Sequence, residues 1–314
     1  MPVNEPSFPG PETSGEAGEL IGSGSFVLDR KLALEKLMRF QLAHPGMYAL
    51  VLLRCAAAGG ASQIFLTHKD GRSVEFRFDG LAFSEEELAD PYACLFRELT
   101  PETTRNRELA TALLSLLRLG PSEITVRSGK GKRRRLLRVT GLDSQSQQPC
   151  ADPETETVLT AVQPAGAPEP LWGPELDALL EDRCRMSAVP IYRNGKLLPA
   201  LRPEESPRAS HSFEEKGVRG LLLVPDDPAK SELRLHRWGV FAEKLSRLSP
   251  EVQVDGYVND DRLRLNTSQG AVVRNARLET VLAAVSAAAT HLALRSALAQ
   301  AQCLDEARPE QRRA

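Results

Sequence analysis

The segment Tyr48–Phe83 constrains the fold of this chain more than any other. It opens with an almost wholly apolar run, Tyr48–Ala58, which ends at Gly59-Gly60. A helix that is apolar nearly all round must be buried on several sides, and glycine commonly ends a helix. Two alternating segments then flank Asp70-Gly71, a strong hairpin signal; they are Gln63–Lys69 and Ser73–Phe78. The segment therefore predicts a buried helix followed by a hairpin of a β-sheet.

The rest of the chain alternates helical patterns with further strand patterns. The expected helices are Leu32–Phe40 after an Asp29 N-cap, a capped start at Ser84–Leu88, Leu109–Leu119, Leu176–Cys184 and Leu278–Ala299. The expected strands are Ser25–Leu28, Glu123–Arg127, Leu136–Thr140, Thr157–Val162, a Val189–Leu198 hairpin with Asn-Gly at its tip, Gly220–Val224 and Glu232–Trp238. This alternation predicts an α/β fold in which each half is an α+β sandwich.

The length of 314 residues allows two domains, each with its own core. Residues 1–24 are rich in Pro, Gly, Ser and Glu, which predicts a disordered leader. We expect a first domain over 25–165 and a second over 171–300, because Ser, Gln, Pro and acidic residues dominate 143–170 and indicate a linker there. The charged residues 301–314 are the expected tail.

The overall composition argues against several classes of protein. The net charge is −2, so no strong field attracts nucleic acid or an anionic membrane, and aromatic residues, at 5%, are few for a base-stacking platform. No uninterrupted apolar run approaches the roughly 20 residues of a membrane span. The five cysteines and five histidines are scattered without ligand spacing. This pattern predicts no metal site, and reduced thiols in a cytoplasm.

The order of the first elements resembles a known family. Helix Tyr48–Ala58, its glycine stop, the hairpin and the Asp79-Gly80 that follows are similar to the opening of a GHKL-type nucleotide-binding domain. Such domains occur in histidine kinases, in the ninety-kilodalton heat-shock chaperones and in the mismatch repair protein MutL. The Val189–Leu198 hairpin also resembles a strand common to these proteins. The resemblance implies a GHKL-like (Bergerat-type) domain in the first half.

The second half resembles the middle domain of the same heat-shock chaperones. Leu233–Phe241, Leu248–Glu251 and Gly256–Ser268 follow one another in the family's order, and Leu278–Ala299 stands where the family has a long helix. The Leu-Asn-Thr-Ser segment at the end of the third motif carries most of the weight. The match runs in order over roughly residues 25–299. It implies a middle-domain-like α/β unit after the GHKL-like domain.

The resemblance also assigns positions to the ATP chemistry, and this chain departs from the family at most of them. Val51 stands in place of the glutamate that activates water, and Cys55 in place of the asparagine that holds magnesium. Valine cannot act as a base, and a neutral thiol is a poor ligand for the hard magnesium ion. Phe78 stands in place of the adenine-binding aspartate; Asp79 and Gly80 come one position later. Such a shift turns a strand residue to the other face.

The remaining family positions are weakened as well. The lid region, Pro101–Ala110, contains no glycine, and Arg105 and Arg107 are the residues there that could neutralise phosphate. Gln269 replaces the middle-domain arginine that reaches the γ-phosphate. The candidate nucleotide-binding residues are therefore Cys55, Asp79, Gly80, Arg105 and Arg107, and no catalytic residue is expected.

The loss of these roles predicts a heat-shock-chaperone-like protein that binds a client or partner protein and does not hydrolyse ATP. One alternative is an ATP-binding chaperone with residual activity, which would use ATP and Mg²⁺ in a rearranged site. A second is a nucleic-acid-associated module of MutL-like ancestry. That module would use the basic run Lys130–Arg135 with Arg138, although a solvated turn is the more ordinary explanation of such a run.

Overall fold

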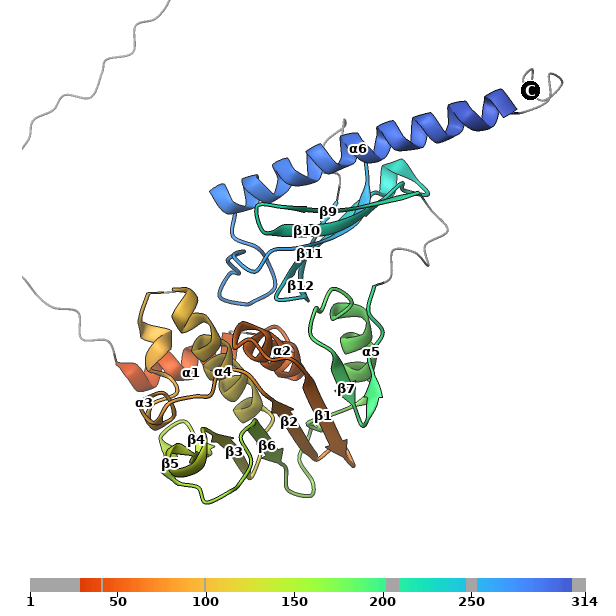
Figure 1. Cartoon of the computed structure of the whole chain (residues 1–314). Coiled ribbons are helices and arrows are strands. Elements are labelled where there is room, and N and C mark those ends of the chain that lie inside the picture. The colour runs from red at the N-terminus through yellow and green to blue at the C-terminus, as the bar shows by residue number, and fades with distance from the viewer. Residues whose placement is uncertain (1–28, 41, 99, 202–208, 247–252, 307–314) are drawn as a thin grey trace, which may run out of the picture.

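A computed structural model describes residues 29–40, 42–98, 100–201, 209–246 and 253–306 of the chain. It shows a mixed α/β protein with two mixed β-sheets, each covered by helices (Figure 1). The expected leader, the strand expected at Ser25–Leu28 and the motif Leu248–Glu251 lie outside the described residues.

The first sheet has eight strands. Its strands, in spatial order, are β5 (Ser144–Pro149), β4 (Arg135–Gly141), β3 (Glu123–Ser128), β6 (Thr157–Val162), β2 (Ser73–Phe78), β1 (Ile64–Lys69), β7 (Ile191–Arg193) and β8 (Lys196–Leu197). All neighbouring strands are antiparallel except β1 and β7, which are parallel. The expected hairpin around Asp70-Gly71 is confirmed, with Asp70 and Gly71 both at positive φ.

Helices cover one face of this sheet (Figure 1). They are α1 (Arg30–Phe40), α2 (Tyr48–Ala58), α3 (Glu85–Ala89) and α4 (Pro101–Arg118), with short 3-10 turns η1 (Pro45–Met47) and η2 (Ala93–Phe96). The bounds of α2 are those predicted, and its residues from Tyr48 to Ala56 are all buried. α4 packs along α2, and apolar residues of both helices lie in one core with the inner face of the sheet. The all-round apolarity of α2 is thus explained by contacts on several sides.

The second sheet has five strands and one long helix. In spatial order the strands are β12 (Val240–Ser246), β11 (Glu232–Arg237), β13 (Asp255–Asn259), β10 (Val218–Leu223) and β9 (Ser210–Glu215). Helix α6 (Ala276–Glu306) lies across one face of this sheet and extends beyond it (Figure 1). α6 is longer than the expected Leu278–Ala299, so residues 301–306 of the predicted charged tail are helical.

The boundary between the two cores lies later in the chain than the composition predicted. Strands β7 and β8 and helix α5 (Pro174–Arg183) fall in the range 171–300 that the sequence assigned to the second domain. In the structure β7 extends the first sheet, and Leu176 and Leu180 of α5 are buried in the first core. β7 belongs to the first sheet because it pairs in parallel with β1, a strand from much earlier in the chain.

Two local expectations also differ. Residues 144–149, placed in a linker because they are polar, form the edge strand β5, whose side chains are largely exposed. Helix α4 begins at Pro101 and not at the expected Leu109, so the lid region is part of this helix. Thr100 caps this helix by accepting a hydrogen bond from the Thr103 amide, and proline at the first helical position is a regular start signal.

Candidate functional site

The two positions that should carry ATP chemistry are closed off inside the first core. Val51 is 1% exposed and Cys55 is 0% exposed. Burial also raises the pKa of the Cys55 thiol, so the group stays neutral. Phe83, Leu88 and Tyr92, from the segment that follows β2, are buried in the same cluster. Val51 and Cys55 therefore lie inside a packed core, at positions where a nucleotide would need open space.

The Asp79 carboxylate links the end of β2 to the residues just before β1 by hydrogen bonds. Its carboxylate accepts hydrogen bonds from the Ser62 amide at 2.7 Å, the Ser62 hydroxyl at 2.5 Å and the Gln63 amide at 3.3 Å. Partial burial opposes ionisation, but the hydrogen bonds from Ser62 and Gln63 outweigh it and hold the pKa of Asp79 below its usual range. The carboxylate is thus a structural acceptor.

Gly80 lets this strand end pass close to the end of α2. Its φ is +90°, and a Cβ built there would lie 2.6 Å from the carbonyl oxygen of Gly59. The next amide, that of Leu81, donates to the same carbonyl at 2.8 Å. The glycine is therefore required by backbone packing, without reference to a ligand.

Arg105 fastens α4 to the segment after Gly80. It makes an ion pair of 2.7 Å with Glu87, donates to the carbonyl oxygens of Leu81 and Ala82, and lies over the ring of Phe83 at 4.2 Å. Its side chain is 6% exposed. The structure therefore places Arg105 in a structural role and not at an open anion site.

Arg107, two residues further along α4, makes different contacts. It donates to the carbonyl oxygens of Cys94 and Arg97 at 3.2 and 2.9 Å, and it also lines a cavity beside α4. Of the five candidate nucleotide-binding residues, Arg107 is thus one that reaches this cavity, and the buried residues Val51 and Cys55 are not part of its lining.

A charged cluster that no sequence motif predicted joins the two cores. Glu108 of α4, 3% exposed, accepts from Arg54 of α2 at 3.2 Å and from Arg237 of β11 at 3.0 Å. Arg54 also donates to the side-chain oxygen of Gln269 at 3.0 Å. Gln269, which the resemblance aligns with an arginine, therefore does approach α2, but as a neutral hydrogen-bond acceptor. Desolvation lowers the pKa of Arg237, against the attraction of Glu108.

The adjoining cavity has a volume of about 300 Å³. Its polar lining comes from α4, β11 and the segment before α6: Arg107, Glu108, Arg237, Arg264, Asn266 and Gln269. Alternating hydrophobicity and helix periodicity could not have revealed it, because its residues lie in separate elements that meet only after folding.

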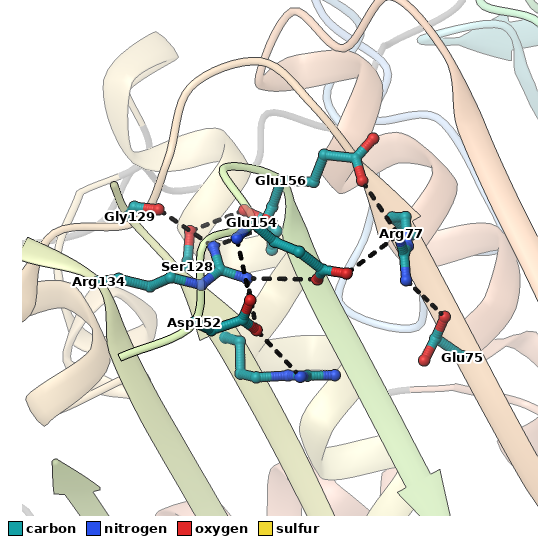
Figure 2. A network of polar contacts seen from close by, with 10 residues as sticks. Glu75, Arg77, Ser128, Gly129, Arg134, Asp152, Glu154 and Glu156 are labelled. Carbon is teal, nitrogen blue, oxygen red and sulfur yellow. Dashed lines mark hydrogen bonds and ion pairs between the residues drawn. The ribbon is translucent and has the colours of Figure 1, made fainter. Parts of the chain in front are cut away.

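Half of the basic residues in the run 130–138 form ion pairs within the chain, namely Arg134, Arg135 and Arg138. Arg134 is 0% exposed and donates to the carbonyl oxygens of Gly129 and Glu156. Figure 2 shows its guanidinium facing Asp152 and Glu154, at 3.6 and 3.7 Å. Arg135 and Arg138 form ion pairs with Glu85 and Glu123. Two neighbouring arginines outside the run also form ion pairs, Arg127 with Asp152, and Arg77 with Glu75, Glu154 and Glu156. Lys132 and Arg133 at the tip are exposed.

In the part of the chain that the structure describes, no group of three or more His, Cys, Asp or Glu side chains is arranged to hold a metal ion. One described helix, α6, is long and apolar enough over Ala276–Gln302 to cross a membrane, and 33% of its most apolar window is buried. Its buried residues, among them Val281 and Val285, pack in the second core. A single such helix is weak evidence for a membrane span.

Neither the models of known protein families nor the curated protein sequences match this chain.

Proposed function

We propose that this chain is a heat-shock-chaperone-like protein built on a degenerate GHKL-type fold, which binds partner proteins and does not hydrolyse ATP. The order of helix α2, the β1–β2 hairpin and Asp79-Gly80 supports the relationship, together with the Leu265-Asn-Thr-Ser268 segment before a long helix. The middle-domain-like part is the second sheet with α6.

The observation that carries the proposal is the complete burial of Val51 and Cys55 in the first core. Hydrolysis would need a base and a magnesium ligand at an open surface. Here those positions hold an apolar side chain and a buried thiol, and Asp79 and Arg105 are bonded to other parts of the chain. A protein that keeps this fold without that chemistry would act by binding other molecules at its surface.

We propose a cytoplasmic setting for this activity. Cys55, Cys94, Cys150 and Cys184 are all free thiols, which suits a reducing compartment.

The first experiment measures client binding. A thermally unfolding model protein is heated with and without equimolar full-length chain, and aggregation is followed by light scattering. We expect the chain to suppress scattering, to the same extent with and without ATP and Mg²⁺, while an unrelated protein of similar size does not. Scattering unaffected by the chain would contradict the partner-binding proposal.

The second experiment tests the rival, an ATP-binding chaperone. A ligand at a hundred times its Kd stabilises a protein by about 2.7 kcal/mol, so ATP with Mg²⁺ would raise the melting temperature measurably. We expect any rise in melting temperature with ATP to be equally large with inorganic tripolyphosphate and to need no Mg²⁺. We also expect no release of phosphate. A Mg²⁺-dependent rise specific to ATP, or steady phosphate release, would support the rival.

A further inference from the structure

The cavity beside the Arg54–Glu108–Arg237 cluster has the features of a binding site. Its volume of about 300 Å³ is at the lower end of the range for small-molecule sites. It is formed by α4 of the first core and by β11 and residues 264–269 of the second half. A molecule bound there would touch both parts of the protein.

The charges around the cavity do not balance. Two buried guanidiniums, those of Arg54 and Arg237, share the single carboxylate of Glu108. Arg54 and Arg237 are 2% and 5% exposed, so the excess positive charge is shielded from water. The carboxylate of Asp261 also attracts Arg237, and it accepts hydrogen bonds from the Trp238 amide and the Asn259 side chain, but it does not line the cavity, whose lining holds three arginines and one carboxylate. Burying a charge without a full counter-charge is costly, and an anion beside it would offset that cost.

Two further arginines line the same space. Arg264 makes no side-chain hydrogen bond or ion pair with other residues that the structure describes, and Arg107 uses its Nη1 group on the carbonyl oxygens of Cys94 and Arg97. Glu108 is the one acidic side chain in the described lining. Guanidinium groups donate in a planar fork that matches phosphate and carboxylate oxygens.

We propose that this cavity binds a small phosphate-type oxyanion between Arg107, Arg237 and Arg264. The anion would complete the charge balance of the buried cluster and would hold the 264–269 segment against α4. The site is separate from Val51, Cys55 and Asp79, and its occupancy requires neither adenine binding nor hydrolysis. The proposal stands apart from the client binding proposed above.

The test is a titration of the full-length chain with inorganic phosphate and with pyrophosphate, read as the melting temperature and by calorimetry, against potassium chloride of equal ionic strength. We expect a saturable rise of about 3–6 °C at a hundredfold excess over Kd. ATP and tripolyphosphate form the other arms, because they carry the same group on a larger molecule.

Phosphate also stabilises proteins by exclusion from their surface, so matched variants are needed. Arg264→Ala removes a lining guanidinium that has no bond to the described residues and should weaken phosphate binding about tenfold or more. Arg295→Ala removes an exposed arginine of α6 and should leave binding unchanged.

A rise that does not saturate, or one that is equal in both variants, would overturn the proposal. Binding by ATP with Mg²⁺ and by none of the other anions would also overturn it, and would contradict the proposed loss of ATP chemistry as well. Phosphate binding with no suppression of client aggregation would leave the anion site standing and remove the chaperone proposal.

Discussion

The guanidinium of Arg54 donates a hydrogen bond of 3.0 Å to the side-chain oxygen of Gln269, although the two residues are 215 positions apart. Arg54 belongs to the central helix of the first core, and Gln269 to the segment that leads into α6. Gln269 has a φ of +58°, an uncommon conformation for a residue with a side chain. The contact therefore fixes a constrained turn against the buried charge of α2.

Replacement of Gln269 tests this contact. Gln269→Ala leaves a buried Arg54 N–H group without its acceptor and should lower the free energy of unfolding by about 1–2 kcal/mol. Gln269→Glu keeps an acceptor and adds the negative charge that the cluster lacks, so it should be neutral or stabilising. Urea denaturation compares the two variants. A loss in Gln269→Glu as large as in Gln269→Ala would contradict this account of the contact.

Glu108 should be far less tolerant. Glu108→Gln removes the single carboxylate that Arg54 and Arg237 share, so two buried cations would lose the ion pairs that hold them together. We expect a loss of about 3–5 kcal/mol, measured by chemical denaturation. Glu214→Gln on the exposed edge strand β9 is the matched control and should change stability by less than about 0.5 kcal/mol. Equal effects at the two sites would show that the cluster is not the cause.

The thiols should differ sharply in reactivity. Burial raises the pKa of Cys94 to about 11 and that of Cys184 to about 12, and it raises the pKa of Cys55 as well. Cys150 is partly exposed. In a Cys303→Ser background at pH 8, a thiol reagent should label Cys150 first and the other three only after unfolding, because thiolate is the reactive form. Peptide mass spectrometry identifies the labelled sites. Rapid labelling of Cys55 in the native protein would mean that its position is open, against the proposed function.

His236 should make stability depend on pH. Desolvation lowers its pKa from 6.5 to about 4, although its ring Nδ1 bonds the carbonyl of Arg234. Below pH 6.5 the unfolded chain therefore binds a proton that the folded chain does not. The stabilisation is complete above pH 6.5 and is lost as the pH falls towards 4, by about 3 kcal/mol in all.

His236→Asn should flatten this part of the stability curve between pH 7 and pH 4, and His44→Asn, at an exposed histidine, should leave it unchanged. The measurement is denaturant unfolding at a series of pH values. An unaltered slope in His236→Asn would assign the pH dependence to other groups.

Replacing two neighbouring arginines of the basic run should change the stability of the protein by very different amounts. Arg134→Met removes a buried guanidinium from the carbonyl and carboxylate contacts of Figure 2 and should cost about 2–3 kcal/mol. Arg133→Met removes an exposed side chain at the tip and should change stability little. Thermal unfolding tests both. Salt-sensitive nucleic-acid binding that Arg133→Met weakens would favour the nucleic-acid alternative instead.

The elements that the sequence predicted well are those with strong local signals. The apolar run of α2 ends at Gly59-Gly60, and the Asp70-Gly71 and Asn194-Gly195 turns lie between short alternating strands; all three were found where expected. Helix α4 starts earlier than expected, and its signal, Thr100 before Pro101, was present in the sequence.

The misplaced elements depend on contacts between distant residues. The polar segment of β5 has no alternation to mark it, and it is a strand because β4 offers it an edge. In the candidate site, the burial of Val51 and Cys55 could be predicted from the apolar run that contains them. The cluster of Arg54, Glu108 and Arg237 could not, because each residue alone looks like an ordinary charged position on a helix or strand.

The parallel pairing of β1 with β7 has a consequence for how the protein is made. A chain leaves the ribosome from its N-terminus, and early segments fold before later ones exist. Strand β1 and its hairpin partner are complete long before Ile191–Arg193, the strand that covers the outer edge of β1, has been synthesised. Until then the nascent chain carries an open strand edge, which is a template for pairing with another chain. Fragments cut at the compositional boundary near residue 165 keep that edge permanently open and should aggregate, whereas those that run past β8 can close it.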